Sequence, residues 1–291
     1  MRDLPSARWI PPAGSPRPVL VAVPHAGRLV PPELLRELCA GVDPAELSDR
    51  FVDLLALGAP GVGIGVVAGL PVRSFLDLNR APFAIDPRVV SGALADWADP
   101  DDPRARAGLG VLPRLGAAGR PLRRRRLSRE DLLLRLHRHH LGYHRLIARR
   151  LAVAAASCGG ALLVDLHSTP EIPGITPFPD IVLSDACGAS CAREVTEALA
   201  AFFRARGLSV AINSPFEGGY TVRRHAAPAR GRHAIQIECA RRLYLAADGR
   251  RPGPGLPMLM RLFDEFWAWL GEHAAALLLP SGEGSSRLAA E

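Results

Sequence analysis

The hydrophobic positions of this chain follow two different spacings. Short apolar runs rich in Val, Ile and Leu predict buried strands, and longer stretches with apolar residues every three or four positions predict helices. The predicted strands span residues 18–23, 62–68, 73–77, 161–166, 208–213 and 233–238. The predicted helices span residues 44–57, 128–156, 187–206 and 256–277. This alternation is typical of an α/β protein whose mostly parallel sheet is covered by helices on both faces.

Two stretches do not follow the alternation. Residues 81–126 are rich in Pro, Gly and Asp and have little periodicity, which predicts a long excursion from the sheet. Loops of that length are often functional. Residues 281–291 have the composition of a disordered tail. No linker divides the remainder, so we expect one domain over residues 1–280.

Composition restricts the class of protein. A hydrophobic content of 48% with 22% charged residues is typical of a globular protein, and the net charge of +7 is carried by Arg alone, since the chain has no Lys. We interpret the excess as a solvated Arg surface rather than a nucleic-acid site, and an anionic small substrate would also fit it. The Arg run at 123–126 has no interleaved aromatic residues, so we interpret it as a solvated helix entry.

Three further features of the sequence bear on the cellular location of the protein and on whether it contains disulfides. The N-terminal segment has no apolar core of a secretory signal, so a cytoplasmic location is the default expectation. The uncharged stretch from Leu54 to Val72 is long enough to cross a membrane, but Gly and Pro interrupt it, and a helix end, a turn and a buried strand are the better interpretation. The five Cys are scattered, which argues against disulfides, and Cys187 and Cys191 are expected in the core of a helix.

Polar residues at predicted strand ends are the candidates for chemistry. His25 follows the first strand, and Asp165 and His167 share one face of the strand at 161–166, with His167 at its end. Ligands bind at the carboxyl ends of strands in open α/β sheets. Two His from two strand ends predict a metal site, for which a third, acidic ligand is needed.

Several residues are open candidates for the remaining roles. Asp49 and Asp53 are spaced to share one face of the helix at 44–57, and either is a possible third ligand. Glu238 shares a strand face with Gln236, and it is either a general base beside a metal or the partner of Arg241 or Arg242. A further set, His137, His140 and His144, shares a helix face, and partly buried side chains are the favoured interpretation for at least two of them.

Eight segments in order resemble the N-formylglutamate amidohydrolase family, over most of the chain. They are PHAG at 24–27, DRFVD at 49–53, RSFLDLNR at 73–80, YHRLI at 143–147, DLHSTP at 165–170, DIVLSDACGASC at 180–191, PFEGGYTVRR at 215–224 and HAIQIECARRLY at 233–244. The family is related to the zinc carboxypeptidases and aspartoacylases. The resemblance therefore implies a three-layer α/β/α fold with a mostly parallel mixed sheet and one catalytic zinc.

The resemblance also implies roles for single residues. It implies His25, Asp49 and His167 as metal ligands, Glu238 as the catalytic carboxylate, and Asn79 with Arg80 as the pair that holds a substrate carboxylate. For a second carboxylate or the developing oxyanion, Arg223 beside Tyr220 and Arg73 are alternatives. Supporting positions near the ligands are assigned to Asp165, Asp53 and Asp77.

The expected activity is zinc-dependent hydrolysis of the amide bond of an N-formyl or other small N-acyl amino acid, an acidic one such as N-formyl-L-glutamate. The chain departs from the family pattern at Arg28, which stands where related metallopeptidases carry the acidic ligand. It also departs at Arg50 and Phe51, in place of an aromatic–His pair, and within 224–230, which lack a Gly. The alternatives are a deacylase or carboxypeptidase-like enzyme with another substrate, and a catalytically silent binding protein of the same fold.

Overall fold

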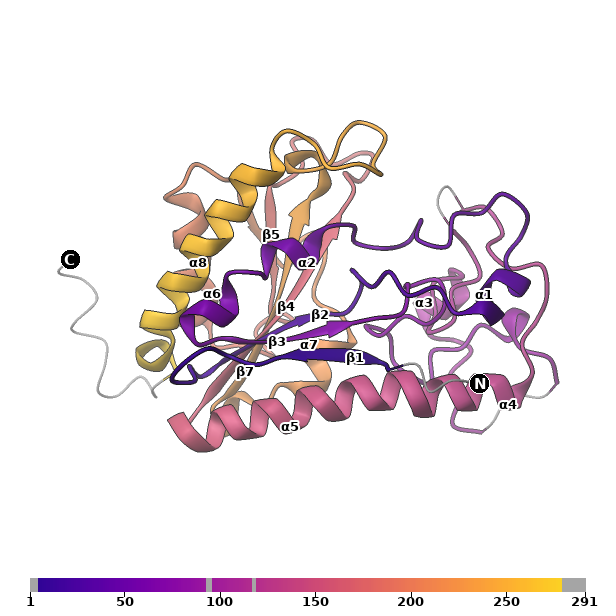
Figure 1. The fold of residues 1–291 in the computed structure, drawn as a ribbon, viewed down its shortest axis with the longest axis horizontal. Coiled ribbons are helices and arrows are strands. Elements are labelled where there is room, and N and C mark those ends of the chain that lie inside the picture. The colour runs from indigo at the N-terminus through magenta and orange to yellow at the C-terminus, as the bar shows by residue number, and fades with distance from the viewer. Residues whose placement is uncertain (1–4, 93–95, 117–118, 279–291) are drawn as a thin grey trace. The chain divides into compact units, whose positions relative to one another are not determined.

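The computed structural model describes residues 5–92, 96–116 and 119–278 (Figure 1). The chain forms two compact units and enters each more than once. Unit 1 comprises Met1–Arg8, Pro24–Arg50 and Ala68–Leu146, and unit 2 comprises Trp9–Val23, Phe51–Val67 and Ile147–Glu291. The predicted tail at 281–291 lies outside the described residues.

A seven-stranded mixed sheet has the order β1-β3-β2-β4-β7-β5-β6. The strands are β1 (Ala7–Ile10), β2 (Val19–Val23), β3 (Gly65–Gly69), β4 (Ala161–Thr169), β5 (Ile181–Ser184), β6 (Val210–Ile212) and β7 (Arg232–Ala240). β2, β4 and β7 are parallel to one another, whereas β5 is antiparallel to β7 and parallel to β6. The expected α/β fold with a mostly parallel mixed sheet is confirmed.

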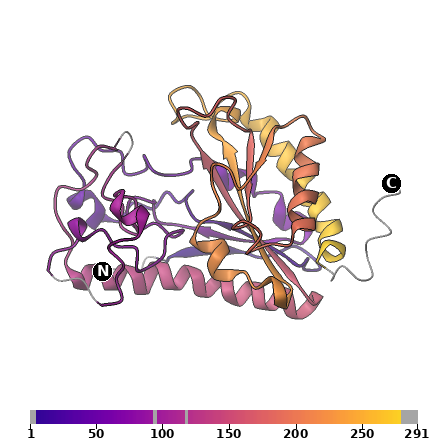
Figure 2. The ribbon, with the colours of Figure 1, turned by 180° about the vertical axis from the view of Figure 1, so that it is seen from behind.

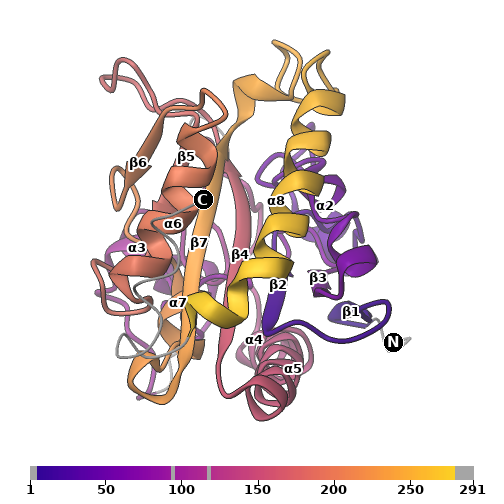
Figure 3. The ribbon, with the colours of Figure 1, turned by 90° about the vertical axis from the view of Figure 1, so that its left-hand side faces the viewer.

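Helices flank the central strands of unit 2. α2 (Val52–Leu55), α6 (Arg193–Arg204) and α8 (Leu256–Leu277) bury Phe203, Phe263 and Trp267 on one side of the strands (Figure 3). The indole of Trp267 donates to the carbonyl of Leu55 over 2.7 Å, which ties α8 to α2. α7 (Tyr220–His225) contacts β4 and β7 from the other side (Figure 2). Short helices η1 (Ala59–Val62), η5 (Pro228–Arg230) and η6 (Arg241–Leu243) complete the unit.

Unit 1 is built mainly from irregular segments and short helices. These helices are α1 (Pro32–Glu37), η2 (Pro87–Val89), α3 (Pro103–Arg106), α4 (Arg129–Arg135) and the π-helical turn η4 (Leu136–His140). α5 (Leu141–Cys158) continues from η4 into unit 2, and Ser128 caps α4 by accepting from the Asp131 amide. The long helix predicted at 128–156 is therefore confirmed, and the predicted excursion at 81–126 contains η2 and α3.

Two predicted elements are wrong. Residues 73–77 form a turn rather than a strand, because the apolar residues there are buried without a neighbouring strand to pair with. The helix predicted at 44–57 is reduced to α2, because Phe51 adopts a left-handed conformation with φ of 65°. Asp49 therefore lies before the helix that contains Asp53, and the two carboxylates do not share a helix face.

Three smaller predictions have different outcomes. Cys187 and Cys191 precede α6 instead of lying in it; Cys191 is buried as expected, but Cys187 is exposed. Arg123 is not a solvated side chain, since it is 2% exposed and pairs with Glu37. The uncharged stretch from Leu54 to Val72 does contain a helix end, η1 and β3. Among the helices of the described residues, none has the length and apolar character of a membrane span.

Candidate metal centre

His25 is held between two carboxylates of unit 1. It lies two residues beyond the end of β2 and is 2% exposed. Its Nδ1 lies 3.5 Å from Asp49 Oδ2, and its Nε2 lies 2.7 Å from Asp77 Oδ1. The Asp49 amide donates to the His25 carbonyl over 3.0 Å, which fixes the two segments side by side.

Asp77 collects several donors in the turn at 73–80. Besides His25, its carboxylate accepts from Arg73 Nε and from the Asn79 amide, each over 2.9 Å, and Arg80 Nε lies 3.8 Å away. Burial alone would raise the pKa of Asp77, but the charges of Arg73, His25 and Arg80 lower it well below its ordinary value. Asp77 is therefore an anion that orients the His25 imidazole.

His167 has a similar carboxylate partner in unit 2. Asp165, two residues earlier on β4, lies with Oδ2 2.9 Å from His167 Nε2, and both side chains are buried. The two residues share one face of β4, as the period of a strand requires. This contact fixes the orientation of the ring.

Glu238 is the register partner of His167 on β7, and Gln236 is that of Asp165. The Gln236 amide donates to Glu238 Oε1 over 2.9 Å and accepts from the Gly219 amide over 2.8 Å. Arg242, one of the alternative partners considered for Glu238, pairs with Asp180 instead. A neutral donor on its own strand therefore contributes to the orientation of the half-buried Glu238 carboxylate.

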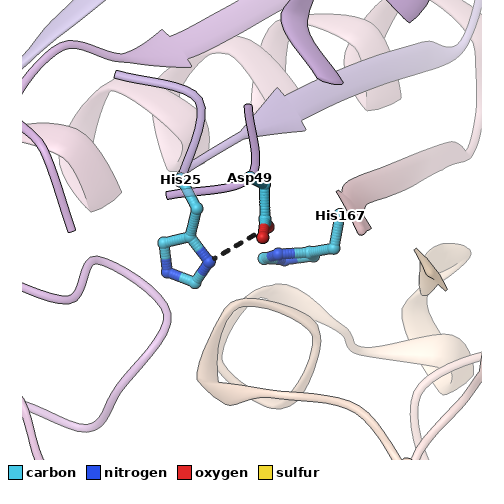
Figure 4. A group of neighbouring side chains, drawn as sticks. All are labelled: His25, Asp49 and His167. Carbon is cyan, nitrogen blue, oxygen red and sulfur yellow. Dashed lines mark ion pairs between the residues drawn. The ribbon is translucent and has the colours of Figure 1, made fainter. Parts of the chain in front are cut away.

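Each of His25, Asp49 and His167 offers a ligand atom, and these atoms all lie within 4.8 Å of one another (Figure 4). All three side chains are buried. Two imidazoles and a carboxylate are a donor set that suits zinc, and three protein ligands are typical of a catalytic site. Each imidazole also has the carboxylate partner that metal-binding His residues commonly have.

The other predicted site residues lie in different surroundings. Asn79 is buried, and Arg80 donates from Nε to the Leu109 carbonyl over 2.9 Å. Burial lowers the pKa of Arg80 from its usual value, and Asp77 opposes that shift. Arg223 is half-exposed on α7 and pairs with Glu217 over 3.6 Å. Two candidates, Tyr220 and Asp53, lie in the first turns of α7 and α2 respectively.

The His cluster of the long helix has a structural environment. His144 and His140 are buried, and their Nε2 atoms bond to the carbonyls of Leu78 and Arg80, each over 2.8 Å. His137 is exposed. The favoured interpretation, buried structural His residues for two of the three, is therefore correct. Sequence reasoning missed their partners and gave no role to Gln236, although the alternation of β7 placed it beside Glu238.

Comparison with known proteins agrees with this geometry. A model of the N-formylglutamate amidohydrolase family matches residues 17–245. Proteins described as N-formylglutamate deformylases from Pseudomonas aeruginosa and Pseudomonas putida are each 30% identical over 237 residues, covering 78% of this chain and 82% of theirs.

Solved structures share the fold. The crystal structure of an N-formylglutamate amidohydrolase from Ralstonia eutropha superposes with a TM-score of 0.84 at 26% identity, over 93% of this chain and 98% of that one. A gene product of Agrobacterium tumefaciens, at 15% identity and a TM-score of 0.61 over 95% and 94% of the two chains, shares the fold alone. These similarities define the class of protein as an amide hydrolase of α/β fold. The chain belongs to the N-formylglutamate amidohydrolase family.

Proposed function

We propose that this protein hydrolyses the amide bond of a small N-acyl amino acid with the help of one divalent metal, most simply zinc, held by His25, Asp49 and His167. The observation that carries the proposal is the buried group of two imidazoles and one carboxylate whose ligand atoms lie within 4.8 Å of one another. When bound, a zinc ion would supply Lewis acidity to a water molecule and to the substrate carbonyl.

The fit of the metal rests on which ring nitrogens are already engaged. Asp77 takes Nε2 of His25 and Asp165 takes Nε2 of His167, so Nδ1 is the donor that each ring would present to the metal. The carboxylates increase the basicity of the rings and hold the required tautomer.

Glu238 is the general base in this proposal. Its position opposite His167 in the β4–β7 register supports a carboxylate beside the metal ligands. The carboxylate takes a proton from the attacking water and delivers it to the departing amine, so that the acid and the free amino acid leave as products. Gln236 keeps the carboxylate oriented during both transfers.

The identity of the proposed substrate is inferred from the names of the relatives and from the Arg side chains near the site. N-formyl-L-glutamate is the compound that the relatives' names indicate, and its two carboxylates match the cationic side chains available. Arg80, with Asn79, binds the α-carboxylate, because a guanidinium can form two parallel bonds to a carboxylate. Arg223 and Arg73 are the candidates for the side-chain carboxylate.

The test combines metal content with turnover. One zinc per chain, and amine release from N-formyl-L-glutamate that a chelator abolishes and zinc restores, is the expected result. Glu238→Gln should keep the metal and lose turnover, while the exposed Glu171→Gln should keep both. A protein without metal and without turnover would overturn the proposal. Metal without turnover on a panel of N-acyl amino acids would instead favour a binding protein.

A further inference from the structure

The turn at 73–80 is held through its backbone carbonyls by side chains from elsewhere in unit 1. Arg123 donates to the carbonyl of Ser74, and Arg135 donates from Nη1 to that of Phe75 over 3.4 Å. His144 and His140 bond to the carbonyls of Leu78 and Arg80, each over 2.8 Å. We call these four side chains, Arg123, Arg135, His140 and His144, the carbonyl clamp.

The clamp is buried and partly charged. Side chains of Arg123 and Arg135 are 2% and 6% exposed, and both pair with the same carboxylate, Glu37. Two guanidiniums for one carboxylate leave an excess positive charge in the interior, and burial accordingly lowers the pKa of Arg123 to about 10, although Glu37 opposes that shift. A buried ionic cluster is weak evidence for a stabilising role, since a protein with apolar residues of similar volume in its place is often as stable or more stable. What the cluster does provide is a fixed position for the carbonyls of Ser74 and Phe75.

The two His residues of the clamp act as hydrogen-bond donors. A carbonyl oxygen can only accept, so Nε2 carries the proton in both rings. Burial lowers the pKa of His140, while the bond to the Arg80 carbonyl and the charge of Asp77 oppose the shift. His140 therefore holds the carbonyl without adding a further charge.

The π-helical turn η4 brings these side chains into line. Arg135, His140 and His144 are separated by five and then four residues, and in a regular α-helix a separation of five would place the first two on different faces. A π-helical turn pairs residue i with i+5, so the residue five positions along takes the place that the fourth has in an α-helix. The His140 and His144 rings stand 4.5 Å apart, one turn from each other.

The clamped turn carries the residues that the proposed function uses. Asp77 orients His25, and Asn79 and Arg80 are the proposed substrate ligands. We propose that the carbonyl clamp is a set of positioning residues that sets the place of Arg80 for the substrate α-carboxylate. This inference rests on the proposed function, and His140 is its most direct test because it bonds to the carbonyl of Arg80 itself.

The experiment compares His140→Phe, which removes the donor, with His140→Gln, whose side-chain amide can still donate. His137→Phe is the matched control, since His137 is exposed on the same helix. Loss of one buried hydrogen bond should make exchange of the Asp77 and Asn79 amides about tenfold faster in His140→Phe, and His140→Gln should restore much of the protection. This measurement by hydrogen exchange does not depend on turnover or on metal.

Kinetics then tests the link to the substrate. In His140→Phe, KM for N-formyl-L-glutamate should rise about tenfold with kcat within about threefold, because ground-state and transition-state binding of the carboxylate weaken together. KM for the matching substrate with an α-carboxamide should be the same in wild type and variant. His137→Phe should behave as wild type with both substrates.

The outcomes separate the two proposals. Unchanged amide exchange in His140→Phe would overturn the clamp, and faster exchange with an unchanged KM would overturn its role in binding the substrate. Faster exchange in a protein whose wild type hydrolyses no N-acyl amino acid would support the clamp of the turn while the proposed function fails.

Discussion

Gln236 Nε2 donates to Glu238 Oε1 over 2.9 Å, and Gln236 Oε1 accepts from the Gly219 amide over 2.8 Å. Both ends of the amide are therefore engaged, and the amide cannot rotate without losing a bond. This arrangement orients a carboxylate that stands opposite His167 in the sheet. The proposed general base, held in this way, would need little reorganisation when it acts.

Removal of this orientation should reduce turnover without removing metal. We expect Gln236→Leu to lower kcat/KM for N-formyl-L-glutamate about tenfold to hundredfold, as for other residues that orient groups next to a metal. Amine release and zinc content measured on the same sample test this. Turnover equal to that of wild type would contradict the role of Gln236, and loss of zinc would mean that the substitution disturbs the ligands instead.

The carboxylate behind His167 should matter for metal affinity. Asp165→Asn removes the negative charge beside Nε2 and should weaken zinc binding about tenfold to hundredfold, because such partners increase ligand basicity. Competition with a chromogenic chelator measures the change. Asp131→Asn, at an exposed position of α4, is the control. Equal affinity in Asp165→Asn and wild type would show that the contact has no part in metal binding.

Removal of one partner from the buried ion cluster should strongly destabilise the fold. Glu37→Gln leaves Arg123 and Arg135 without a carboxylate, and we expect the free energy of unfolding to fall by about 3–5 kcal/mol. Urea denaturation followed by circular dichroism measures it. Glu33→Gln, in the first turn of the same helix, should change it by less than about 0.5 kcal/mol. A loss for Glu37→Gln as small as that of the control would contradict the buried pairing.

Stability should fall in mild acid. Burial lowers the pKa of His139 and His233 below the ordinary value of 6.5. Between the folded value and 6.5, the unfolded chain binds more protons than the folded one, so the free energy of unfolding decreases as pH is lowered through this window. Unfolding midpoints between pH 7 and pH 5 test the slope. His139→Leu should flatten it, His137→Leu should not, and an identical slope in His139→Leu would contradict the assignment.

The strand ends that carry His25 and His167 were predictable from the sequence. The apolar runs at 18–23 and 161–166 form buried central strands, and the period of two decides which side chains share a face. The relation of Asp165 to His167 and of Gln236 to Glu238 follows from this local rule.

Residues fixed by contacts distant in sequence were not predictable in this way. The run of Val72, Phe75, Leu76 and Leu78 has the composition of a strand, yet it forms a turn because Arg123, Arg135 and the buried His residues satisfy its carbonyls. A single left-handed residue, Phe51, ends the helical pattern around Asp49. Neither the partners of these carbonyls nor the conformation of Phe51 has a signature within its own segment.

The π-helical turn at Leu136–His140 also constrains chain length. Deletion of one residue before His140 would make the helix regular and would bring His140 four residues after Arg135, still on the same face. Insertion of a further residue would instead rotate the helix after it by about 100° relative to Arg135, since each residue of an α-helix turns by that amount. His140 and His144 would then face away from the carbonyls that they hold. An insertion in the irregular segments at 81–92 or 96–116 would leave this helix face unchanged. Among variants of this chain, insertions within residues 136–140 should therefore be as restricted as the identity of His140.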